Sequence, residues 1–247
     1  MTEEKSQEKL LPPYPRMGEI YRTLALAFDT KARNRDVDKY AREGDVDWRL
    51  PGGLVDELFF KPFRAVLDEE YAGALCQSLI RFYRDYISLV ASLGLDALLR
   101  EKALPVLIES FFVPRGASVL HGLAESFGGP ELARLLDSEH TSIAAVFEWS
   151  SPEDTYSLAK AAFPGSTGAD KTSREMVFRW IQGKHLPDLP NIRLFLSALE
   201  RNGSAEQKRR IPDLKRWLTT ARAIDWLERS SDGCSPKSLM LSFILSG

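Results

Sequence analysis

The stretch spanning residues 171–199, KTSREMVFRWIQGKHLPDLPNIRLFLSAL, constrains the fold of this chain more than any other part of it. Four apolar residues in its first half recur at the spacing of one helical stripe: Met176, Val177, Trp180 and Ile181. Gly183 follows at the position of a left-handed C-terminal cap, and Pro187 and Pro190 prevent that helix from continuing. The stretch therefore predicts a helix, a tight turn and a second helix.

Both predicted helices have recognisable starts. Thr172 or Ser173 can cap the first helix, because a short hydroxyl accepts a free backbone N–H there, and Asn191 can begin the second. The second helix has an apolar face that consists of Ile192, Phe195, Leu196 and Leu199. Because Trp180 lies on the stripe of the first helix, we expect it to be buried in a core rather than to contact a ligand.

The pattern S-R-x-x-V-x-R-W-x-x-G-K, followed by a proline and an apolar helix ending in A-L, resembles the phage-repressor (Cro-type) helix-turn-helix domain. The matching positions are Ser173, Arg174, Val177, Arg179, Trp180, Gly183, Lys184, Pro187, Leu196, Ala198 and Leu199. Upstream, Leu158 and Ala159 resemble the Leu-Ala pair of the family's second helix, which we expect to start at 151–154. Residues 137–148 are expected to form the first helix, so the resemblance covers roughly residues 137–199.

In that family the helix before the Gly-Lys pair is the recognition helix, whose N-terminal residues meet base edges in the major groove. The resemblance implies a groove-facing set that consists of Ser173, Arg174, Glu175, Phe178 and Arg179. It places four further residues near phosphates: Lys171, Thr172, Lys184 and His185. Two features differ from the family. Residues 164–171 predict a longer turn before the recognition helix, and Phe178 replaces a small polar residue on the exposed side.

The remaining chain also predicts helices separated by short Gly/Pro joints. We expect helices over 20–32, 36–42, 69–99, 95–112, 117–127, 131–136 and 212–229. Turns are predicted at 49–53, 113–116 and 128–130, where Gly and Pro cluster. Since the period-two alternation of strands is absent, the sequence predicts an all-α fold with at least eight helices.

We divide the chain into four parts. Residues 1–15 are predicted to be a disordered lead, because three prolines oppose a helix there. A helical bundle over 16–136 would serve sensing, dimerisation or partner binding, and 137–203 would form the helix-turn-helix-like module. Residues 204–247 would add C-terminal helices, and the apolar tail 238–245 should dock on the body or on a partner, since its exposure would be costly.

Charge is unevenly distributed along the chain. The net charge is −2 overall, −6 over residues 1–150 and +4 over residues 151–229. The basic excess coincides with the predicted module and agrees with a phosphate-facing surface, although ordinary scatter of charge over solvated faces gives the same pattern. The absence of a run of 18 apolar residues predicts no membrane span, and two cysteines predict no disulfide framework. A cytoplasmic location is the resulting default.

Residues that could carry catalysis do not form a known constellation. The histidines His121, His140 and His185 lie outside metal-binding spacings, and Ser118 and Ser126 lack a G-x-S-x-G context. The segment PGSTGADKTS departs from the P-loop pattern G-x-x-x-x-G-K-[ST]. We therefore predict no catalytic, cofactor-binding or metal site, and no enzyme.

Two functional hypotheses follow from the sequence. The first is a DNA-binding protein, a transcriptional regulator of prokaryotic or phage type, whose module binds duplex DNA. The second is a helical interaction protein, or an accessory subunit of a nucleic-acid-processing complex, that uses the helix-turn-helix shape against protein. Arg174, Arg179 and Phe178 should discriminate between them, because arginine reads guanine whereas a buried aromatic anchors a protein interface.

Overall fold

The computed structural model describes residues 14–30, 55–93, 100–231 and 233–246, together with the single positions 35 and 53. Of the residues so described, 78% are helical, and none of them forms a strand. The all-α prediction is therefore confirmed. The predicted helix at 36–42 and nearly all of the lead 1–15 lie outside the described residues.

The N-terminal half contains α1 (Met17–Ala27), a π-helical turn η1 (Asp56–Phe60), α4 (Lys61–Arg64), α5 (Glu69–Leu93), α6 (Arg100–Leu107), a second π-helical turn η3 (Ile108–Phe112), α7 (Val113–Phe127) and α8 (Leu132–Leu135). The C-terminal half contains α9 (Ser142–Ser150), α10 (Ser157–Ala162), α11 (Gly168–Ile181), α12 (Leu189–Asn202), α13 (Ala205–Arg209), α14 (Ile211–Ser230) and α15 (Pro236–Ser246).

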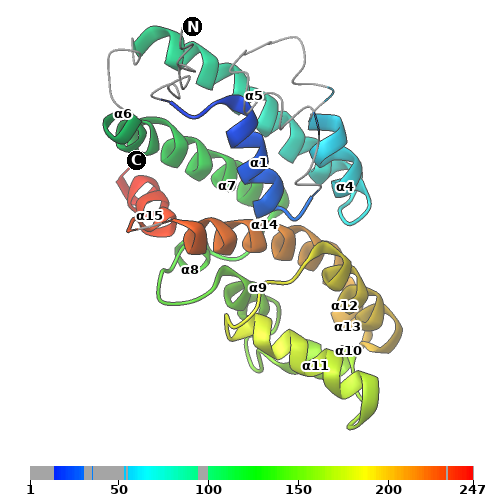
Figure 1. Cartoon of the computed structure of the whole chain (residues 1–247). Helices are drawn as coiled ribbons and strands as arrows, with labels where there is room; N and C mark the ends of the chain where they lie inside the picture. The colour runs from blue at the N-terminus through cyan, green and yellow to red at the C-terminus, as the bar shows by residue number, and fades with distance from the viewer. Residues whose placement is uncertain are drawn as a thin grey trace, which may run out of the picture.

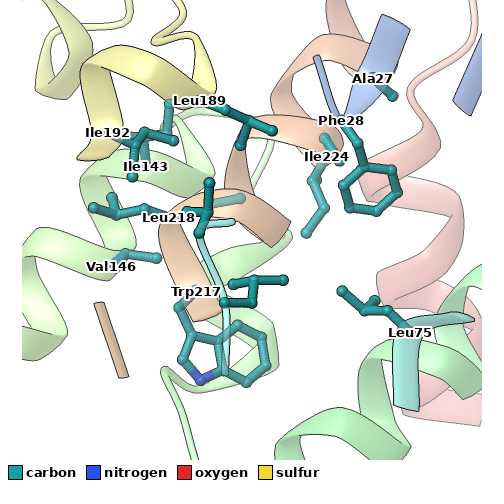
Figure 2. Packing of buried hydrophobic residues seen from close by; sticks show 14 of the residues in the cluster. Ala27, Phe28, Leu75, Ile143, Val146, Leu189, Ile192, Trp217, Leu218 and Ile224 are labelled. Atoms are coloured by element: carbon teal, nitrogen blue, oxygen red, sulfur yellow. The ribbon is translucent and has the colours of Figure 1, made fainter. Parts of the chain in front are cut away.

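Helix α14 is the centre of the molecule. It contacts α1, α9, α12 and α15, and Figure 1 shows it between α1, α5 and α7 on one side and α9, α11 and α12 on the other. Figure 2 shows its Trp217, Leu218 and Ile224 between two groups of buried side chains. One group comes from α9 and α12 and consists of Ile143, Val146, Leu189 and Ile192. The other consists of Ala27, Phe28 and Leu75. One helix thus supplies core to both halves.

The predicted turn at 113–116 was wrong, because these residues form the first turn of α7. Pro114 is tolerated there because it follows the π-helical turn η3, where the regular i to i−4 hydrogen-bond ladder is interrupted. The π-helical turn η3 precedes it, so α6, η3 and α7 run on without a break, with Pro105 inside α6. By length and composition alone, Glu101–Phe127 could cross a membrane, with mean hydropathy 1.4 and 28% of its most apolar window buried.

The C-terminal tail docks on the body, as predicted. Helix α15 contacts α7 and α14, and Met240 is buried between them, whereas Leu245 stays exposed. The stop at 128–130 is also confirmed, because α7 ends at Phe127 and Gly128 takes the left-handed φ of 64°.

Candidate nucleic-acid interface

The first helix of the predicted module is shorter than expected. Helix α9 begins at Ser142 rather than at residue 137, because Thr141 caps it and accepts the Ala144 N–H at 3.0 Å. Residues 151–154 do not start a helix either. Asp154 instead accepts the Tyr156 N–H at 2.9 Å in a turn, and α10 begins at Ser157.

The turn between α10 and α11 is also shorter than predicted. Thr172 and Ser173 are not caps, because α11 begins at Gly168 with Thr167 at its N-cap position, and the Thr172 hydroxyl donates to the Gly168 carbonyl at 3.3 Å. Only residues 163–167 therefore join the two helices. The side chain of Asp170 holds this turn by accepting the Gly165 N–H at 3.1 Å.

The inner face of α11 is the predicted apolar stripe. Val177, Trp180 and Ile181 are buried, and Trp180 is 0% exposed, which confirms its core position. Gly183 has a φ of 70°, and the N–H of Lys184 donates to the Arg179 carbonyl at 2.8 Å. This is the predicted left-handed cap, which favours glycine because it lacks a Cβ.

The outer face of α11 is polar and exposed. It consists of Lys171, Thr172, Glu175, Arg179 and Gln182, which share one side of the helix by spacing. Lys171 and Glu175 form a surface ion pair at 3.9 Å. In Figure 1, α11 lies along the lower edge of the molecule, away from α1, α5 and α7. We call these five residues the outer face of α11.

Three of the residues predicted to face the groove lie elsewhere. Ser173, Arg174 and Phe178 are half-buried on the flank of α11. Arg174 donates from Nη1 to the Phe163 carbonyl at 3.3 Å, so its guanidinium braces the end of α10. The ring of Phe178 packs edge-on against Tyr156, with 4.8 Å between the ring centroids. The expectation of an exposed Phe178 was wrong, because residues 155–156 form a turn that brings Tyr156 over it.

The predicted phosphate-contacting residues Lys171, Thr172, Lys184 and His185 are all exposed. A further cation joins them at the C-terminal end of α11. Arg229 of α14 is exposed, and its Nη2 donates to the Gly183 carbonyl at 2.6 Å. No local pattern marks this residue, since it lies 46 positions after its partner and only tertiary folding brings it there.

An acidic turn lies beside the C-terminal end of α11. Thr141 lies against Gly183, since a Cβ added to Gly183 would come within 2.7 Å of its methyl group. The preceding turn contains Asp137 and Glu139, and hydrogen bonds from the Glu139 N–H and from His140 hold the pKa of Asp137 below its usual value. This turn therefore places negative charge near the C-terminal end of α11.

No other part of the described chain offers a stronger site. Within the described ranges, no group of three or more His, Cys, Asp or Glu side chains could hold a metal ion. A shallow groove of about 660 Å³ between α5 and α7 contains four serines, Ser88, Ser92, Ser110 and Ser118. Each hydroxyl donates to a carbonyl of its own helical segment, so none is paired with a general base.

Comparisons with known proteins found no matching family model, no matching curated protein and no matching solved structure for this chain. The resemblance to the Cro-type domain therefore stays a prediction that rests on its own residues.

Proposed function

We propose that residues 141–203 form a helix-turn-helix module that binds duplex DNA, and that the protein is a transcriptional regulator of prokaryotic or phage type. The observation that supports this most is the outer face of α11. It is polar and uncovered, follows a short turn from α10, and ends beside the cations of Lys184 and Arg229. Helix α14 would connect the module to the N-terminal helices, which would sense a signal or a partner.

Arg179 is the residue that we assign to base recognition. It is exposed on the outer face of α11, and its fork of N–H donors matches the O6 and N7 acceptors of guanine. Arg174 takes a different role, because its guanidinium already donates to the Phe163 carbonyl. Lys184 and His185 would contact phosphates, which position a protein on DNA without reading its sequence.

Binding of the full chain to selected and random duplexes tests this assignment. Arg179→Ala should weaken binding to the selected site by ~1–3 kcal/mol more than binding to random duplex. Lys184→Ala should weaken both about equally and reduce the slope of affinity against salt by about one ion. Arg81→Ala, which removes an exposed arginine of α5, is the matched control and should change neither. Absence of duplex binding by the wild type at about 50 mM salt would contradict the proposal.

One observation favours the second candidate, a protein-binding module. Glu175 lies in the middle of the outer face of α11, where a carboxylate would oppose DNA phosphates but suit a basic protein surface. If this candidate holds, charge reversal by Glu175→Lys should release a co-purifying partner that has a basic surface, while wild type retains no duplex. Phe178 is no longer the expected anchor, because Tyr156 already covers part of its ring.

A further inference from the structure

Two buried charges of α14 lie almost one helical turn apart, and each holds the start of a different helix of the module. Arg222 is 7% exposed and Asp225 is 3% exposed. A buried charge is costly unless it is paired and hydrogen-bonded, so the partners of these two residues define what α14 can hold in place.

Asp225 caps α9 from the side. Its Oδ1 accepts the Ser142 N–H at 2.7 Å, and its Oδ2 accepts the Ile143 N–H at 3.1 Å. These two amides belong to the first turn of α9, where free N–H groups attract a carboxylate. The neighbouring residue Thr141 donates its hydroxyl to the Ile181 carbonyl at 3.5 Å, so the start of α9 also contacts the end of α11.

The countercharge for Asp225 comes from α15. Lys237 is 2% exposed, and its Nζ lies 2.7 Å from Asp225 Oδ1 and donates to the His140 carbonyl at 2.9 Å. The backbone N–H of Lys237 donates to Glu228 at 3.1 Å, which fixes the start of α15 on α14. If α15 moved away, Asp225 would be left buried without its cation, so the positions of α15 and α9 are energetically coupled.

Helix α15 also contacts the N-terminal half through α7. Met240 is buried against Gly116, and a Cβ added to Gly116 would meet its Sδ at 3.1 Å. A displacement of α7 therefore acts on α15 directly, and α15 acts on α9 through Lys237 and Asp225.

Arg222 makes a parallel connection from α1 to α12. Its Nε donates to the Pro187 carbonyl at 2.7 Å, and its Nη1 donates to the Leu26 carbonyl at 3.0 Å. Asp29, just after α1, accepts the Leu189 N–H at 2.9 Å, so a side chain from the N-terminal half caps the start of α12. The first and last helices of the module, α9 and α12, are thus both held by residues from outside the module.

We propose that α15 is a clasp through which the N-terminal helices regulate the outer face of α11. In this structure the clasp is closed: Lys237 pairs with Asp225, and the first turn of α9 is hydrogen-bonded to Asp225 beside the end of α11. A ligand or partner that shifts α7 would loosen α15, free the first turn of α9 and lower the affinity of the module for its target. We call the contacts that run from α7 through α15 to α9 the mechanical link. The regulation of DNA binding rests on the proposed function, whereas the mechanical link does not.

Hydrogen exchange on the whole chain of 247 residues tests the coupling of α7 to α9 through α15. Lys237→Met keeps the length of the side chain but removes its charge, and should speed exchange in the first turn of α9 by about tenfold, equivalent to ~1.4 kcal/mol. Exchange in α5 should stay unchanged. Gly116→Leu, a wedge against Met240, should produce the same change from the N-terminal half. Gly122→Leu is the matched control, because it lies on the same helix and a Cβ there has nothing within 4 Å.

The outcomes separate the clasp from the proposed function. If Gly116→Leu leaves α9 exchange equal to that of Gly122→Leu, or if exchange rises equally in α5 and α9, the clasp is overturned. The comparison of Gly116→Leu with Gly122→Leu tests the clasp even if Lys237→Met does not fold. If wild type binds no duplex but the exchange pattern is as expected, the DNA function fails and the mechanical link stands. If wild type binds duplex and Gly116→Leu binds as tightly as Gly122→Leu, regulation of DNA binding by the clasp is refuted.

Discussion

Two fully buried tryptophans provide a sharp test of how this core is held together. Trp180 of α11 and Trp217 of α14 are both 0% exposed, so replacing either by phenylalanine removes a similar volume from a packed interior. Their indole N–H groups differ. Trp217 Nε1 donates to the Gly128 carbonyl at 2.8 Å, whereas Trp180 Nε1 is buried without a hydrogen-bond partner.

The difference sets the expected ranking of the two substitutions. Trp217→Phe loses a hydrogen bond worth ~0.5–1.5 kcal/mol, in addition to the loss of volume. Trp180→Phe instead removes an unpaired buried donor, which relieves a penalty of ~1–3 kcal/mol. We therefore expect Trp217→Phe to lower the free energy of unfolding by about 1.5–4.5 kcal/mol more than Trp180→Phe does. Trp180→Ala, which empties the site, should cost ~3–5 kcal/mol.

Urea unfolding followed by far-ultraviolet circular dichroism measures these differences, because the signal does not depend on the tryptophan that is removed. A gap of 2 kcal/mol corresponds to about 4–8 °C in Tm for a chain of this size. Equal destabilisation by the two phenylalanine variants, or a greater cost at Trp180, would refute the reasoning about the unpaired N–H.

Two further predictions concern packing and pH. Gly129→Ala should cost ~3 kcal/mol or more in thermal unfolding, because its Cβ would lie 2.2 Å from the buried Trp217 ring, whereas Gly122→Ala on α7 should be neutral or stabilising. Asp68 is partly buried, which alone would raise its pKa, but the hydrogen bond and charge of Arg216 hold the pKa below its usual value. The ionised Asp68 carboxylate therefore stabilises the fold at neutral pH, and this stabilisation is lost as pH falls through the lowered folded-state pKa of Asp68. Asp68→Asn should flatten the fall of Tm with acidification, and an unchanged acid limb would contradict this.

Features that depend on a few adjacent residues could be predicted from the sequence alone. Gly183 ends α11 in a left-handed turn, because glycine adopts a positive φ without steric cost. The apolar spacing of α14 predicted a helix from 212 to 229, and the structure has Ile211–Ser230. Trp180 was assigned to the core from the same kind of periodicity. Each of these inferences uses only the 3.6-residue repeat and local backbone sterics.

Local rules failed where neighbouring structure compensates for an unfavourable residue. Pro114 reads as a turn, yet it lies in the first turn of α7 after a π-helical turn. Residues 168–171 read as part of a turn, yet they are helical, with Asp170 hydrogen-bonded to the turn before them. Glycine and proline mark local breaks in secondary structure, but side-chain hydrogen bonds and helix junctions can override them.

Only the tertiary structure decided which polar side chains of the candidate interface are available. The sequence predicts Arg174, Phe178 and Arg179 together on the exposed side of one helix. In the structure Arg174 is hydrogen-bonded to the end of α10 and Phe178 packs against Tyr156, whereas Arg179 is exposed to solvent. The buried pair of Asp225 and Lys237 carried no sequence signal, because each looks like an ordinary surface charge until α15 packs against α14 and α7. Periodicity determines which face of a helix is apolar, but the partners of a polar side chain depend on segments distant in sequence.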